Sequence, residues 1–118
     1  MHSNFRLVHS LEKRQNVSKM ISEKYPEKIP VIAESHIRNK NIKLDRSKFL
    51  VPSDIVLNKF VIELRKHIIN LNSHAAIYPI LEDGTIPPLT TLISTIYNKN
   101  RNIDGFLYIT LCEENTFG

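Results

Sequence analysis

The chain of 118 residues and 13.7 kDa has room for one domain with a real core but not for two. Its hydrophobic share of 42% and charged share of 24% are ordinary for a globular protein. The sequence has no run of roughly 20 apolar residues for a membrane span and no apolar core of a signal peptide, so we expect a cytosolic protein. A net charge of +4 and a pI near 9.3 favour acidic partners, but the basic residues are scattered, so we expect no nucleic-acid partner.

The single cysteine, Cys112, excludes an internal disulfide and a cysteine-based zinc cluster. It is either a catalytic thiol or a small residue at the end of a strand, and the sequence favours the second. The five histidines stand in no HExxH context, and three glycines are too few for a Walker or dinucleotide pattern. The chain is therefore predicted to be no enzyme, with no cofactor and no metal.

A helix is predicted near the beginning of the chain. Ser10 is the candidate N-cap, and Pro26 ends the helix because a proline disfavours helical backbone at the residue before it. The apolar residues between them recur at about the helical period: Leu11, Val17, Met20, Ile21 and Tyr25. A shorter helical turn is expected around residues 3–8.

Two strands and a second helix follow. Strands are predicted over residues 28–34 and 48–51, joined in antiparallel fashion across a polar loop at 39–45, and the second strand should lie at an edge of the sheet. Ser53 or Asp54 would then cap a long helix, whose core-facing residues recur at helical spacing: Leu57, Val61, Leu64 and Ile68.

The last third of the chain contains two more strands. The strand at 76–81 carries Pro79, which cannot donate a ladder hydrogen bond, so we expect an edge strand with this position facing outward. A turn at 83–84, a loop or a short helix from Pro87 through Ile96, and a turn at 104–105 lead to an apolar run at 106–111 that is typical of a central strand. The order predicts an α+β fold, with a four-stranded sheet crossed by a helix and extra N-terminal helices.

Seven short segments carry a more specific pattern. They are Glu12–Arg14, Lys24–Ile32 (KYPEKIPVI), Leu44–Asp54 (LDRSKFLVPSD), Leu64–Lys66, Ile86–Pro88, Asp104–Tyr108 (DGFLY) and Thr116–Gly118 (TFG). In this order they resemble the GABARAP-like family of ubiquitin-like autophagy modifiers, and the resemblance spans about residue 11 to the last residue.

The resemblance implies a ubiquitin-like β-grasp fold, with a helical extension at 1–26, a core at 27–111 and a conjugation tail at 112–118. It implies that Gly118 is joined to phosphatidylethanolamine by ubiquitin-like activating and conjugating enzymes and is released by a delipidating cysteine protease. The lipidated protein would act as an adaptor on the autophagosome membrane. Two alternatives stay open: the same conjugation on another organelle membrane, and a non-conjugated trafficking or cytoskeletal adaptor.

Side-chain alternation in the predicted strands indicates two pockets for a peptide. The first pocket would be formed by Pro30, Ile32, Lys48, Leu50 and Phe106, with Ile21 closing it. The opposite strand face, with the helix that follows, would form the second pocket from Phe49, Val51, Pro52, Ile55 and Phe60. An open edge strand beside two pockets suits receptors and adaptors that carry an aromatic-x-x-aliphatic motif.

Charges should set the preference for residues around the motif. Basic side chains beside the pockets would favour acidic neighbours: Lys28, Arg46, Lys48 and Arg65. Three residues depart from the usual family pattern. Val17 stands where an acid is common, Glu63 where an aliphatic residue lines the second pocket, and His67 where an arginine is usual. We expect Glu63 to disfavour aliphatic ligands, because desolvating a carboxylate costs free energy, unless this side chain turns to water.

Overall fold

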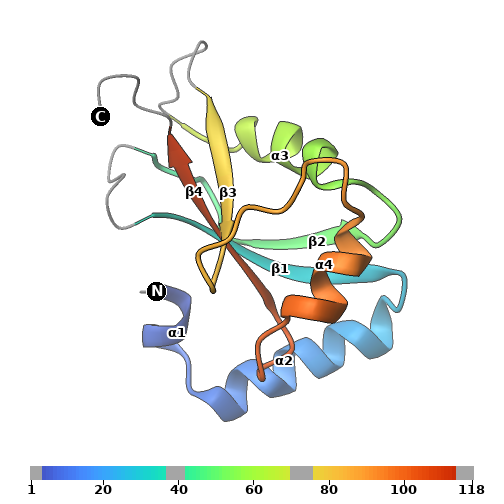
Figure 1. Ribbon diagram of the computed structural model, residues 1–118. Helices are drawn as coiled ribbons and strands as arrows, with labels where there is room; N and C mark the ends of the chain where they lie inside the picture. Colours follow the sequence, from blue (N-terminus) through green and yellow to red (C-terminus); the bar gives the residue numbers. More distant parts are fainter. Residues whose placement is uncertain (1–3, 37–41, 70–75, 114–118) are drawn as a thin grey trace.

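The computed structural model describes residues 4–36, 42–69 and 76–113, so Gly118 and part of the predicted loop at 39–45 lie outside the described residues. The helices α1 (Asn4–Val8) and α2 (Leu11–Lys24) precede the strands β1 (Lys28–Ser35) and β2 (Lys48–Pro52). The elements α3 (Leu57–Arg65), β3 (Ile77–Leu81), α4 (Ile93–Asn100) and β4 (Leu107–Glu113) complete the predicted order (Figure 1). The strand β4 thus extends two residues into the segment that the sequence assigns to the tail.

The four strands form one mixed sheet in the order β2-β1-β4-β3. The strand β1 is antiparallel to β2 and parallel to β4, and β3 is antiparallel to β4. The residues from Leu107 to Leu111 are all buried, which confirms the prediction of a central strand covered on both faces. The predicted α+β class is likewise confirmed.

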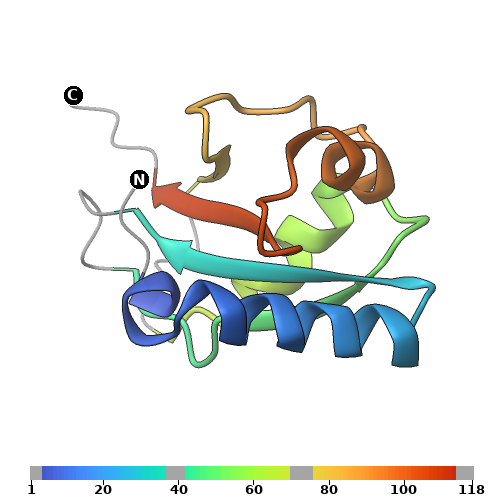
Figure 2. The same ribbon diagram turned by 90° about the horizontal axis from the view of Figure 1, so that it is seen from below.

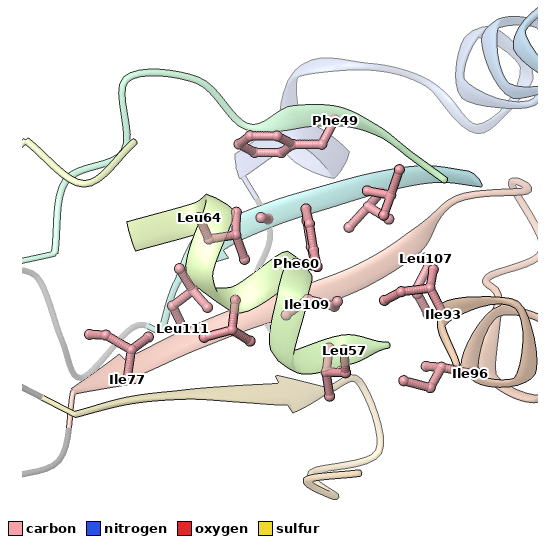
Figure 3. Close-up of a cluster of buried hydrophobic side chains, with 14 of the residues drawn as sticks. Phe49, Leu57, Phe60, Leu64, Ile77, Ile93, Ile96, Leu107, Ile109 and Leu111 are labelled. Atoms are coloured by element: carbon pink, nitrogen blue, oxygen red, sulfur yellow. The ribbon is translucent and has the colours of Figure 1, made fainter. Parts of the chain in front are cut away.

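The helices lie in two layers, one on each face of the sheet. The helices α3 and α4 cover one face, and α1 and α2 cover the other (Figures 1 and 2). Figure 3 shows α3 crossing the sheet, with Phe60 and Leu64 among the side chains of the main core. The predicted stripe is confirmed on α3 for Leu57, Val61 and Leu64, which are buried; Ile68 is buried as well but lies beyond the end of this helix.

A buried carboxylate fixes α2 to the other face of the sheet. Asp104 accepts hydrogen bonds from Nη1 of Arg14 at 2.7 Å, from the hydroxyl of Tyr108 at 2.5 Å and from the amide of Phe106 at 2.8 Å. The hydroxyl of Ser18 donates to the carbonyl of Asp104. A buried charge is tolerated when it is paired and its acceptor positions are filled, and this carboxylate meets both conditions.

The turn at Gly105 lets this contact form. Gly105 has φ of +90°, and a Cβ at this position would collide with the side chain of Ser18. Only a glycine combines this backbone conformation with the close approach of α2. The turn predicted at 104–105 therefore also determines how closely the N-terminal helix packs.

The beginning of α3 differs from the prediction. Ser10 does cap α2, since its hydroxyl oxygen accepts from the amide of Lys13 at 3.2 Å. Neither Ser53 nor Asp54 caps α3, whose N-cap is Val56 without a side-chain hydrogen bond. The first-turn amides instead find carbonyl partners in the loop before α4: the amides at 57 and 58 donate to the carbonyls at 91 and 89 over 2.8 and 2.9 Å.

Two further expectations are corrected. The strand β3 does lie at a sheet edge, but Pro79 is buried, because strand side chains point perpendicular to the sheet whether or not the strand is at its edge. On α2, Leu11 and Met20 are exposed, and the contacts to the sheet come from Val17, Ile21 and the buried Ser18. The polar Asp104 network, and not a continuous apolar stripe, orients this helix.

Candidate functional site

The register of β1 and β2 brings the residues of the first predicted pocket together. Pro30 lies opposite Leu50, and Ile32 lies opposite Lys48. Ile32 is fully buried beside Phe106, with Ile21 of α2 packed against them. Leu50 is 39% exposed, and the Lys48 side chain is exposed as well. The pocket therefore has a buried apolar floor and a rim on β2 that a ligand can touch.

A cavity of about 260 Å³ adjoins this rim. Its lining comes from both N-terminal helices and from β2: Phe5, His9, Lys13, Arg14, Val17 and Lys48. The ring of Phe5 meets that of Phe106 edge to face, with 5.3 Å between the centroids. The sequence missed the contributions of α1, because a five-residue helix carries no pattern that says which face of the sheet it covers.

The two basic side chains Arg14 and Lys48 at the first pocket differ in whether they can bind a ligand. Burial disfavours the charged form of Arg14, but hydrogen bonds with Asp104 and Tyr108 outweigh this effect and raise the pKa of the guanidinium. Arg14 is thus committed to the buried network. Lys48 lies exposed on the rim, where it can meet an acidic residue of a ligand.

The residues of the second predicted pocket lie together, but their own side chains fill it. Phe49, Val51 and Phe60 are only 2–3% exposed and belong to the main core, while Ile55 packs against it from a half-buried position. The rings of Phe49 and Phe60 meet edge to face at 5.7 Å, and Pro52 is half-buried at the end of β2. A ligand side chain could enter here only if one of these groups moved.

Charged side chains border the second pocket. The guanidinium carbon of Arg46 lies 4.6 Å from the centre of the Phe49 ring, and the His67 ring lies 5.3 Å from it. Glu63 is exposed, with one carboxylate oxygen 3.4 Å from Nζ of Lys66. His67 thus contacts the second pocket directly through Phe49, and Glu63 lies beside it, with a carboxylate oxygen 3.7 Å from Nε2 of His67.

The remaining predicted residues lie at the ends of elements. Lys28 begins β1 opposite Pro52, and Arg65 ends α3; both are half-buried. Among the described strands, β2 pairs only with β1, so its other edge is open to an added strand. In the described ranges, no group of three ligating side chains could hold a metal ion. Within the same ranges, no helix has both the length and the apolarity needed to cross a bilayer.

The mixed sheet, the helix crossing it and the two N-terminal helices define a ubiquitin-like protein with a helical extension. Residues 13–118 match the family described as "Autophagy protein Atg8 ubiquitin like", and the chain belongs to this family. It is therefore a ubiquitin-like autophagy modifier, which confirms the resemblance found in the sequence.

Relatives match over nearly their whole length. The chain is 47% identical over 116 residues to autophagy-related protein 8 of Dictyostelium discoideum, covering 98% of this chain and 94% of that protein. It is 46% identical over 118 residues to autophagy-related protein 8 of Schizosaccharomyces pombe, covering 100% and 96%.

Solved structures agree with the fold. The crystal structure of Trypanosoma brucei ATG8 superposes with a TM-score of 0.90 at 35% identity and full coverage of both chains. Plasmodium falciparum Atg8, solved in complex with a Plasmodium falciparum Atg3 peptide, superposes with a TM-score of 0.84 at 26% identity, covering 97% of this chain and 98% of that one.

Proposed function

We propose that this protein is conjugated through Gly118 to phosphatidylethanolamine. The groove formed by the two pockets beside β2 would then recruit partners to the autophagosome membrane. The partners of the conjugation would be ubiquitin-like activating and conjugating enzymes, with a cysteine protease for delipidation. Family membership supports this chemistry, and the Atg3 peptide bound to the Plasmodium relative supports an Atg3-type protein as one partner.

The groove would bind aromatic-x-x-aliphatic peptides of receptors and adaptors. One observation carries this proposal: the register sets Pro30 opposite Leu50 and Ile32 opposite Lys48, directly beside the open edge of β2. A peptide added to that edge would form main-chain hydrogen bonds with β2 and present alternate side chains to the groove. Lys48 on the rim would attract acidic residues next to the motif.

Peptide binding is tested by titration calorimetry on three variants. Leu50→Ala should weaken binding by about 1–3 kcal/mol, the loss typical of an interface anchor. Lys48→Ala should cost less and its effect should shrink with added salt, because a rim charge is screened. Ile62→Ala is the matched control, since Ile62 is an exposed aliphatic residue of α3 that belongs to neither predicted pocket. Equal affinities for Leu50→Ala and wild type would move the site elsewhere.

Conjugation is tested in a reconstituted reaction with the activating and conjugating enzymes and vesicles that contain phosphatidylethanolamine. Gly118→Ala should greatly reduce the lipid-linked form seen by mass spectrometry, because the side chain hinders the terminal carboxyl in a narrow enzyme channel. The same variant should bind peptides like wild type. Full lipidation of Gly118→Ala would reject this assignment of the conjugation site.

A further inference from the structure

Three side chains contact the Phe49 ring in the second pocket. Phe60 meets it edge to face at 5.7 Å, His67 does so at 5.3 Å, and the guanidinium of Arg46 lies 4.6 Å from its centre. Phe49 is only 3% exposed in this arrangement. A peptide side chain can therefore enter the second pocket only if the Phe49 ring or a group packed against it, such as Phe60, His67 or Arg46, moves.

Two carboxylates hold the imidazole of His67 in place. Its Nδ1 is 2.9 Å from a carboxylate oxygen of Asp45, and its Nε2 is 3.7 Å from a carboxylate oxygen of Glu63. The backbone adds to the first contact, because the amide of Asp45 donates to the carbonyl of His67 at 2.9 Å. The His67 side chain is 22% exposed, so a proton can reach it from solvent.

The protonation state decides how many of these contacts are attractive. A carboxylate can only accept hydrogen bonds, so the neutral ring donates from Nδ1 to Asp45 and leaves a lone pair on Nε2 facing Glu63. The protonated ring is a donor at both nitrogens and is held by both carboxylates. The neighbouring cations are Lys66, 3.4 Å from Glu63, and Arg46, whose guanidinium lies over the Phe49 ring. Histidine is the side chain whose charge ordinarily changes between about pH 5 and 8.

We propose that His67 determines the specificity of the second pocket: when its ring is protonated, Asp45 and Glu63 hold it against Phe49 and close the pocket to the aliphatic residue of a peptide. The inference rests on the peptide binding proposed above and adds its control by pH. In this proposal Glu63 holds the protonated His67 ring in its closed position. This is how Glu63 would disfavour aliphatic residues, as the sequence predicts.

The experiment uses two capped peptides without titratable groups, which differ only in leucine or alanine at the aliphatic position. Titration calorimetry at pH 7.5 and 5.5 gives the affinity ratio of the leucine to the alanine peptide, in which the contribution of the first pocket cancels. For the wild type this ratio should be about two- to fivefold larger at pH 7.5 than at pH 5.5, the factor that a partly exposed ion pair is typically worth. In His67→Gln the ratio should be the same at both pH values.

The controls separate this inference from the proposed function. His36→Gln removes a histidine that follows β1 and should keep the pH effect of the wild type. Glu63→Gln, at an exposed position, should reduce the effect without relying on the folding of the His67 variant. A ratio that does not change with pH in the wild type, or that changes equally in His67→Gln, overturns the role of His67 while leaving peptide binding intact. Failure of both peptides to bind at either pH overturns the proposed function, and this inference with it.

Discussion

Replacing Asp104 with asparagine should destabilise the fold by about 3–5 kcal/mol, the usual cost of removing one partner from a buried ion pair. The Asp104 side chain is fully buried, and that of Arg14 is only 12% exposed. The variant leaves the guanidinium without its counter-charge, and an amide cannot accept from Arg14, Tyr108 and the amide of Phe106 as a carboxylate does. Most of the cost comes from the partly buried cation that remains.

A double-mutant cycle isolates this pairwise contribution. Arg14→Met keeps the aliphatic stem of the side chain but removes its charge, so it leaves the buried carboxylate unpaired. The double variant Arg14→Met/Asp104→Asn should be more stable than the sum of the two single effects predicts, by about 0.5–3 kcal/mol. The matched control is the pair of Arg6 and Glu82, which also joins an N-terminal helix to the core but whose side chains are 22% and 27% exposed. Its coupling should be only about 0.2–1 kcal/mol.

Urea unfolding at neutral pH measures all the variants, with the slope of each transition checked against that of the wild type. Additive effects of the Arg14 and Asp104 substitutions, or an equally strong coupling between Arg6 and Glu82, would refute the reasoning that burial makes the first pair dominant. Peptide affinity offers a second measurement. Because α2 carries Val17 and Ile21 to the groove, loosening this helix should weaken binding even though Asp104 lies outside the groove.

Three further predictions concern residues packed where α1 and α2 cover the sheet. Gly105→Ala should lower the free energy of unfolding by about 1–3 kcal/mol in urea titrations, because φ is +90° and the new Cβ would meet Ser18; an unchanged stability would mean that α2 can shift at no cost. Burial and a hydrogen bond to a buried carboxylate raise the pKa of Tyr108 above its ordinary value of 10.0. The unfolded chain therefore ionises first, stability should fall as the pH rises above about 10, and Tyr108→Phe should flatten this fall in unfolding curves measured between pH 8 and about 11. Phe5→Ala should cost about 1–2 kcal/mol in the same urea assay, since it removes the edge-to-face contact with Phe106; a loss below about 0.3 kcal/mol would show that α1 contributes little to the fold.

Alternation and local signals in the sequence determine much of the site. In the strands at 28–34 and 48–51 successive side chains point to opposite faces, so a residue two positions on always shares a face. This rule alone puts Pro30 with Ile32 and Lys48 with Leu50, and the antiparallel register confirms that the pairs meet. The apolar run at 106–111 likewise predicts a central strand, because only a strand covered on both faces can bury consecutive residues.

Only the tertiary structure decides which groups face these residues from distant parts of the chain. The sequence groups Phe49 with Phe60 but does not show that Phe49 fills the second pocket, because this depends on its packing against Phe60 of α3 and against His67, which follows α3. Asp45, before β2, joins this cluster through the hydrogen bond from its amide to the carbonyl of His67. The start of α3 also depends on distant residues. Ser53 and Asp54 are suitable N-cap residues by type, but the first amides of α3 donate instead to carbonyls of the loop before α4. Helix caps and strand faces depend on a few neighbouring residues, whereas the closure of a pocket depends on long-range contacts that no local pattern contains.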